Sequence, residues 1–140
     1  MAEFTNSTTA LVAAGQNVPL TETAVAGNCS IVHRDGAGIV TLRGLTNQCR
    51  ARYKVSFGAN IAIPTGGTVE AISLAIAVNG EPLVSATAIV TPAAVGDYWN
   101  IFVSANVDVP RGCCLTVAAE NTSGQAINVA NANMTVERTA

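Results

Sequence analysis

Charge is scarce in this sequence. Only 11% of its residues are Asp, Glu, Lys or Arg, against roughly 25% in an ordinary soluble domain. Hydrophobic residues, in contrast, make up 49% of the chain. An interface between identical subunits replaces solvated polar surface with apolar contact, so this composition predicts a homo-oligomer rather than a monomer.

Long apolar runs are also missing. A membrane-spanning helix needs about 18 or more continuous apolar residues, and the uncharged segment 55–69 is interrupted by Ser, Asn, Pro, Thr and Gly. The sequence therefore predicts no membrane-spanning helix and no membrane partner.

A basic face is not apparent either. The net charge is −2, and the basic residues occur among acidic ones along the sequence. Because nucleic-acid binding depends on clustered cations that neutralise phosphates, no nucleic-acid partner is expected. The segment 1–6 lacks the basic stretch and apolar run of a secretory signal, so we expect the chain to be made, and to stay, in a cytoplasm.

Four cysteines are present, at positions 29, 49, 113 and 114. A chain of 140 residues can bury a sufficient core without disulfides. Without a signal for secretion, the cysteines do not indicate a disulfide framework. We expect reduced, mostly buried thiols on which the fold does not depend.

What the chain has in abundance is short segments rich in Val, Ile, Thr and Ala, separated by Gly, Pro, Asn and Asp about every ten residues, a pattern typical of all-β domains. Strands are predicted near residues 9–14, 18–24, 28–34, 38–43, 51–62, 69–78, 83–91, 97–109, 113–120 and 126–137. They predict one antiparallel two-sheet sandwich of the jelly-roll type over residues 9–140. Residues 1–8, rich in Ser, Thr and Asn, are predicted to be an N-terminal arm.

Two predicted strands show which side chains should be buried. Alternation in 52–63 assigns Tyr53, Val55 and Phe57 to the core. Asn79-Gly80, between two apolar segments, predicts a tight hairpin, because both residues tolerate positive φ.

The predicted strand 97–109 has two unlike faces. One carries Trp99, Ile101 and Val103, and we expect this row in the core. The other is mixed and carries Tyr98 and Phe102. These two aromatics are candidates for a subunit interface.

No set of residues predicts an active site or a cofactor site. His33 is the single histidine, and a general base needs an orienting group and a nucleophile converging on it. A zinc site from Cys29, His33 and the adjacent Cys113 and Cys114 is not expected, because neighbouring residues of a strand point to opposite faces. We therefore expect no catalytic residues, no metal ligands and no cofactor, and we expect a non-enzymatic protein.

Three segments resemble the tumour-necrosis-factor-like jelly roll. They are Tyr53-Lys54-Val55-Ser56-Phe57, the segment Val109-Pro110-Arg111-Gly112-Cys113-Cys114-Leu115-Thr116-Val117, and Ser123-Gly124-Gln125 before a final strand. Ala51 and Cys113 stand where that family usually has Gly and Asp. The resemblance implies a homotrimer, and it places Phe102 where the family often has an aromatic residue near the threefold axis.

A further likeness is to small proteins encoded among structural genes of tailed bacteriophages and prophages of gut bacteria. It rests on Asn28-Cys29-Ser30-Ile31-Val32-His33-Arg34, on Gly44-Leu45-Thr46-Asn47-Gln48-Cys49-Arg50 and on Ile89-Val90-Thr91-Pro92-Ala93-Ala94-Val95. It implies a virion protein, such as a capsid decoration protein or head fibre, assembled in the host cytoplasm and bound to other virion proteins such as the major capsid protein. The alternative is a receptor- or glycan-binding module displayed on a phage tail or a bacterial surface.

Overall fold

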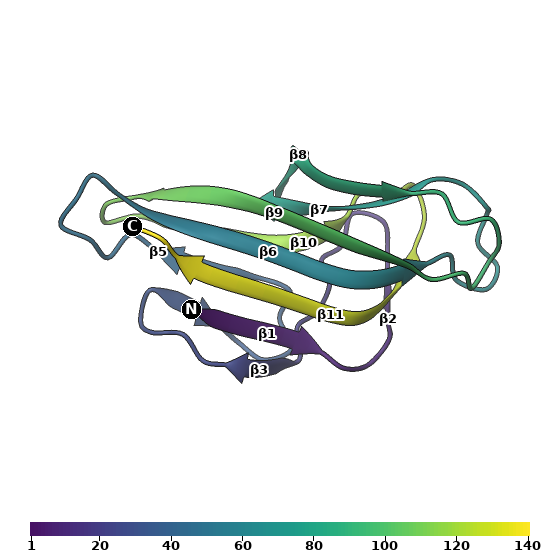
Figure 1. Cartoon of the computed structure of the whole chain (residues 1–140), viewed down its shortest axis with the longest axis horizontal. Helices are drawn as coiled ribbons and strands as arrows, with labels where there is room; N and C mark the ends of the chain where they lie inside the picture. Colours follow the sequence, from purple (N-terminus) through teal and green to yellow (C-terminus); the bar gives the residue numbers. More distant parts are fainter.

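A computed structural model describes all residues, 1–140, and its regular structure consists of eleven strands (Figure 1). They are β1 (Ala2–Asn6), β2 (Ala10–Val12), β3 (Glu22–Val25), β4 (Ile31–His33), β5 (Val40–Arg43), β6 (Arg50–Ala62), β7 (Ile72–Val78), β8 (Glu81–Val90), β9 (Trp99–Pro110), β10 (Cys114–Asn121) and β11 (Ile127–Arg138). The structure contains no helix with the length and apolar character needed to cross a bilayer.

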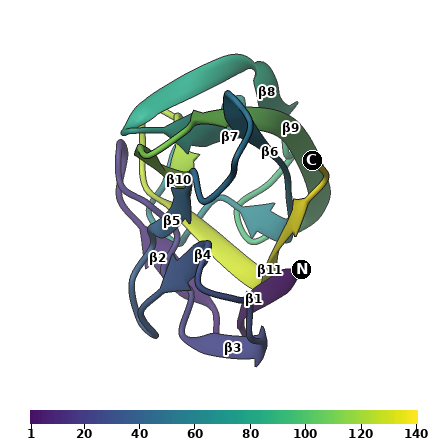
Figure 2. The ribbon, with the colours of Figure 1, turned by 90° about the vertical axis from the view of Figure 1, so that its left-hand side faces the viewer.

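The strands form two sheets packed face to face, which end-on appear as two layers (Figure 2). The first sheet, here the front sheet, has the order β3-β1-β11-β6-β9, with β2 also paired to β11. The second, the back sheet, has the order β4-β5-β10-β7-β8. Neighbouring strands are antiparallel throughout, so the predicted all-β, two-sheet antiparallel sandwich is confirmed.

The central strand β6 shows how the sequence pattern places the core. It pairs with β11 on one side and β9 on the other, so both of its backbone edges are hydrogen-bonded. Tyr53, Val55 and Phe57 alternate with polar residues and are fully buried. They belong to a cluster of 30 buried apolar residues between the sheets.

Tyr53 also joins the two layers through its hydroxyl. The Tyr53 Oη–H donates a hydrogen bond of 2.7 Å to the backbone carbonyl of Arg43 on β5. This bond satisfies a polar group that is otherwise surrounded by apolar side chains, as buried hydroxyls require.

The Asn79-Gly80 hairpin is present between β7 and β8. Both residues have positive φ, 52° at Asn79 and 82° at Gly80. The two strands pair antiparallel, with Val78 opposite Glu81. This prediction is confirmed, and it fixes β8 as the edge strand of the back sheet.

The prediction that residues 1–8 form an N-terminal arm is wrong for residues 2–6. These residues form β1, which lies between β3 and β11 in the front sheet. Ala2, Phe4 and Asn6 alternate inward and are buried. Asn6 can be buried because its Nδ2 donates to the carbonyl of Pro19 and its Oδ1 accepts from Thr8, which replaces the hydrogen bonds of water.

Candidate functional site

Strand β9, the edge strand of the front sheet, presents the candidate interface residue Phe102. Its inward row includes Ile101 and Val103, which are buried in the core cluster. Phe102 lies between them on the outer face, and 66% of its surface is exposed. Tyr98, the other candidate, precedes β9 and is also exposed.

Trp99 is not in the core, and its predicted position is corrected by the structure. Its exposed fraction is 48%. It occupies the last rung of the β6–β9 ladder, opposite Ile61, and its indole Nε1–H donates to Asp97 Oδ2 at 3.2 Å. The alternation placed Trp99 on the same row as Ile101, but Trp99 is the first residue of β9 and its side chain is about half exposed there, whereas Ile101 and Val103 are buried.

Exposed apolar side chains gather where the two sheets end side by side. Strands β8 and β9 are the edge strands of their sheets and lie next to each other (Figures 1 and 2). Six of the thirteen exposed large apolar residues lie on them or on the loop between them, a set we call the edge patch: Val84, Ile89, Val95, Tyr98, Trp99 and Phe102. Apolar surface concentrated in this way is typical of an interaction site.

Beside Phe102, the outer face of the front sheet is polar and largely uncharged. A chain of amides crosses three strands: Asn100 Nδ2 donates to Asn60 Oδ1 at 3.1 Å, and Asn60 Nδ2 donates to Asn131 Oδ1 at 3.0 Å. Amides can donate and accept hydrogen bonds but do not transfer protons near neutral pH. These amides can therefore form hydrogen bonds to another surface.

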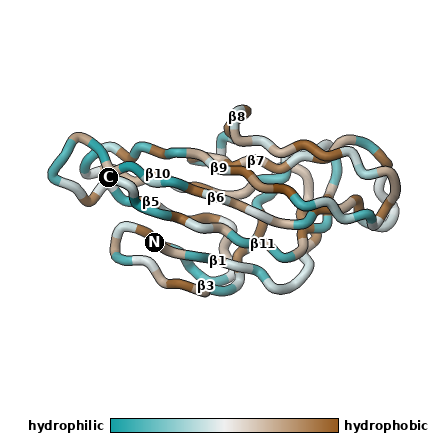
Figure 3. The backbone as a smooth tube through the Cα atoms, viewed as in Figure 1, coloured by the Kyte–Doolittle hydropathy of each residue, from teal (hydrophilic) through white to brown (hydrophobic).

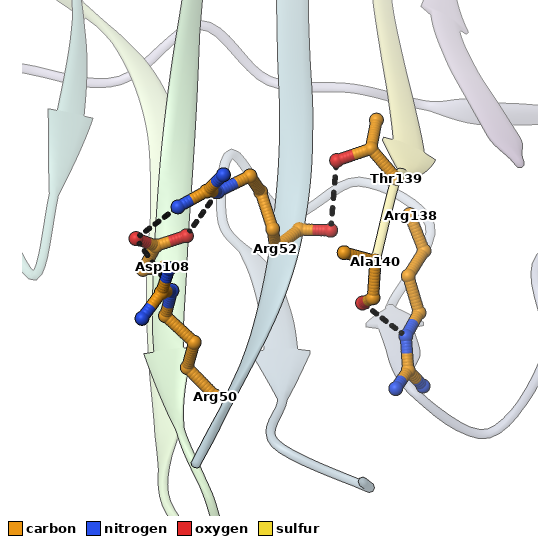
Figure 4. A network of polar contacts seen from close by, with 6 residues as sticks. All are labelled: Arg50, Arg52, Asp108, Arg138, Thr139 and Ala140. Atoms are coloured by element: carbon orange, nitrogen blue, oxygen red, sulfur yellow. Dashed lines mark hydrogen bonds and ion pairs between the residues drawn. The ribbon is translucent and has the colours of Figure 1, made fainter. Parts of the chain in front are cut away.

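An ion-pair cluster lies at the far end of that face, on β6 and β9. Asp108 accepts two hydrogen bonds from Arg52, at 2.7 Å to Nε and 3.1 Å to Nη2, and pairs with Arg50 Nε at 3.2 Å (Figure 4). The Arg52 hydrogen bond holds the pKa of Asp108 below its ordinary value, and the same bond raises the pKa of Arg52. Such an exposed ion pair adds little to the stability of the fold, and salt screens it.

His33 is held as a structural residue. Its side chain is fully buried, its Nε2 lies 3.0 Å from the carbonyl of Ala37, and its ring centroid lies 4.4 Å from that of Phe4. Nδ1 has no hydrogen-bond partner, and the closest carboxylate oxygen, on Asp35, is 3.8 Å away. None of the three shallow surface pockets is lined by His33.

No group of three or more His, Cys, Asp or Glu side chains is placed to hold a metal ion. The prediction of mostly buried thiols is wrong, because Cys29, Cys49, Cys113 and Cys114 are all unpaired and exposed. Each lies in, or directly beside, a loop, where strand alternation no longer places a side chain in the core. No sequence signal distinguished these loop positions from buried ones.

The basic residues are less dispersed in space than along the chain. Arg50 lies opposite Pro110, Arg43 opposite Cys114, and Arg138 opposite Tyr53 in the strand ladders. Arg138 also donates from Nη1 to the carbonyl of Leu45. Strand pairing thus collects at one end of the sandwich arginines that the sequence separates, which corrects the expectation of dispersed basic residues.

Neither a family model nor a curated relative matches this sequence. Solved structures do match its fold. The globular domain of zebrafish complement 1qA protein matches with a TM-score of 0.60 at 12% identity, over 99% of this chain and 98% of that one. Eiger TNF from S. frugiperda matches with a TM-score of 0.65 at 15% identity, over 99% of this chain and 91% of that one. Two antiparallel sheets of eleven strands, with matches along almost the whole chain, show that this protein has the tumour-necrosis-factor-like jelly-roll fold.

Proposed function

We propose that this chain is a non-enzymatic structural protein of a bacteriophage particle, a homotrimeric jelly roll that decorates the capsid or extends from it as a head fibre. The fold supports a binding or structural module. The virion role is supported by the likeness of segments 28–34, 44–50 and 89–95 to phage structural proteins. In this role the partners are two further copies and other virion proteins such as the major capsid protein.

The observation that carries the trimer is the exposure of Phe102. A benzyl side chain that is two-thirds exposed, beside neutral amides, leaves a large apolar area in water. Burial of a Phe side chain contributes about 1.5–3 kcal/mol. Three copies meeting around Phe102 would bury that surface, and the rest of the edge patch would extend the contact.

Light scattering tests the assembly directly. The wild-type protein should have a mass near three times 14.2 kDa. Phe102→Asp should be monomeric, because three carboxylates would meet without water or counter-ions. Val32→Asp is the matched control, since Val32 is an exposed apolar residue on β4, at the opposite edge of the sandwich. A monomeric wild type, or a Phe102→Asp variant that stays trimeric, overturns the assignment.

The virion role has a separate test. Mass spectrometry of purified intact particles should find this chain at a fixed ratio to the major capsid protein, and imaging should place it on the head. Its absence from purified particles would contradict the proposal while leaving the trimer intact.

The second candidate, a receptor- or glycan-binding module, is favoured by the amides beside Phe102. Sugars are bound by an aromatic ring next to hydrogen-bonding amides, and Asn100 and Asn60 lie on the same face as Phe102. This reading requires Phe102 to be accessible in the assembled protein. A glycan array probed with the wild type and with Phe102→Ala decides it: loss of a specific glycan signal in the variant supports a binding module.

A further inference from the structure

All four thiols lie at one end of the sandwich, on or directly beside three loops. We call this region the thiol end: residues 26–30, 44–49 and 111–114, at the left of Figure 1. The backbone N–H of Gly44 donates to the carbonyl of Cys113 at 2.8 Å, and that of Arg111 donates to Cys49 at 3.0 Å. Each of the four cysteines is exposed and unpaired.

The strand register keeps Cys29 and Cys113 from pairing easily within one chain. The backbone N–H of Arg43 donates to the carbonyl of Ser30 on one side, and on the other side Arg43 lies opposite Cys114. One residue further along, Gly44 therefore lies between Cys29 and Cys113. Two strand spacings put their Cα atoms roughly 9–10 Å apart, whereas a disulfide spans about 4.4–6.8 Å. Cys113 and Cys114 are adjacent in sequence, where Cys113 ends the turn and Cys114 begins β10.

The same end carries a concentration of positive charge. Five of the chain's six arginines lie on it or on the strand ends beside it: Arg43, Arg50, Arg52, Arg111 and Arg138. Asp108 contacts two of them. In the hydropathy view, the β5–β6 loop at this end is largely hydrophilic (Figure 3). Clustered cations attract anions.

Cys49 is the thiol that is best placed among these cations. It lines a shallow pocket of about 260 Å³ together with Gln48, Arg50, Arg52 and Ala140. Arg50 engages Asp108 through Nε, and its side chain is 56% exposed. The pocket is smaller than the roughly 300–1,000 Å³ of drug-sized ligand sites, which suits a single anionic group.

We propose that the thiol end is a site of S-thiolation, at which Cys49 takes up half of an anionic low-molecular-weight disulfide of the oxidised-glutathione class. The Cys49 thiolate attacks one sulfur of the small disulfide, a new S–S bond forms, and the old one breaks. The departing half leaves as a thiolate and takes the proton that the Cys49 thiol released. The electron pair of the broken S–S bond leaves with the departing sulfur, which is thereby reduced to the thiol level, while the Cys49 sulfur is oxidised to the disulfide level, so no further oxidant is needed.

Electrostatic repulsion disfavours the competing product, a disulfide between two chains. Joining two thiol ends would bring ten arginines together, five from each chain, with few carboxylates to offset them. A carboxylate-bearing adduct instead reduces the positive charge of the end. The mixed disulfide is therefore the expected end product, and it is independent of the virion role.

The test compares two small disulfides of opposite charge, oxidised glutathione and the diamine cystamine, each incubated with the full-length protein at low salt. Intact-mass spectrometry and peptide mapping follow the adducts. Modification of Cys49 by oxidised glutathione should be about tenfold faster than by cystamine, the lower end of electrostatic rate enhancements. The difference should collapse near 1 M salt, where the screening length is about 3 Å.

Matched variants locate the effect. Arg50→Gln should slow the reaction with oxidised glutathione without slowing that with cystamine. Arg34→Gln removes the one arginine outside the thiol end and should change neither rate. Cys49→Ser should abolish the fast adduct, whereas Cys114→Ser should retain it.

Three results would overturn the proposal. They are equal rates with the two disulfides, disulfide-linked dimers on non-reducing gels, and loss of two thiols without an adduct, which would indicate a disulfide within the chain. The oligomeric state of the untreated protein is measured separately, so failure here is distinguishable from failure of the proposed function.

Discussion

Strands β6 and β8 both carry apolar residues, yet the fold uses them differently. β6 lies inside the front sheet between β11 and β9, and its row of Tyr53, Val55 and Phe57 is fully buried. β8 is an edge strand paired only with β7, and its outward residue Val84 is 93% exposed. An apolar residue on an outward-facing edge contributes nothing to the chain's own core, so its surface is available to another chain.

The strongest test of this comparison removes a β6 side chain. Phe57→Ala should lower the free energy of unfolding by about 3–5 kcal/mol, because the cavity lies between two packed sheets. Chemical denaturation measures this loss, and light scattering should show an unchanged assembly for the folded fraction. A loss below about 1 kcal/mol would mean that the core repacks around the missing ring.

A smaller effect is expected from the bond between the layers. Tyr53→Phe keeps the ring but removes the donor to the Arg43 carbonyl, and it should cost about 1–2 kcal/mol. Urea melts of the two proteins provide the measurement. An equally stable variant would show that water replaces the hydroxyl at that carbonyl.

A substitution on the outward face of β8 should hardly change the stability of the subunit. Val84→Ser should change the free energy of unfolding of the dissociated subunit by no more than about 0.5 kcal/mol. It should weaken self-association by about 1.5 kcal/mol or more if Val84 is buried between subunits. Sedimentation at several protein concentrations measures the change in association separately from the change in subunit stability. Unaltered association would show that Val84 is not part of the interface.

The smallest effect is expected on the solvent face of β6, where Arg52 pairs with Asp108. The pKa of Asp108 is lowered in the folded chain from an ordinary value of 3.8. The stabilisation is therefore present above about pH 4 and is lost as the pH falls through the folded-state pKa. Melting temperatures of wild type and Asp108→Asn should differ slightly at neutral pH and low salt, and should converge in acid or at high salt. A difference that persists under strongly acidic conditions would rule out this ion pair as its source.

How far the sequence predicted the structure depends on how local the determining interactions are. The buried row of β6 and the Asn79-Gly80 turn follow from alternation and from backbone conformations that those residues tolerate. Both were read correctly, because each is encoded within a few neighbouring residues.

The misreadings all concern partners that are distant in the sequence. Phe4 was assigned to an arm because its surroundings are polar, but β11, more than 120 residues away, pairs with it as Phe4↔Met134. Trp99 has the right alternation but is the first residue of β9, where its side chain is about half exposed. The cysteines and arginines of the thiol end are brought together by strand pairing alone, and no sequence motif predicts this grouping.

The position of β11 sets a condition on the order in which the protein can fold. β11 is the last strand of the chain, and it pairs with β1, β2 and β6. During synthesis from the N-terminus, β1 and β6 emerge with their shared partner still unmade, so the front sheet cannot close until residues 127–138 are available. Long-range pairing of this kind slows folding and leaves strand edges open to other chains. A nascent chain should therefore be most vulnerable to aggregation just before its final twelve-residue strand leaves the ribosome.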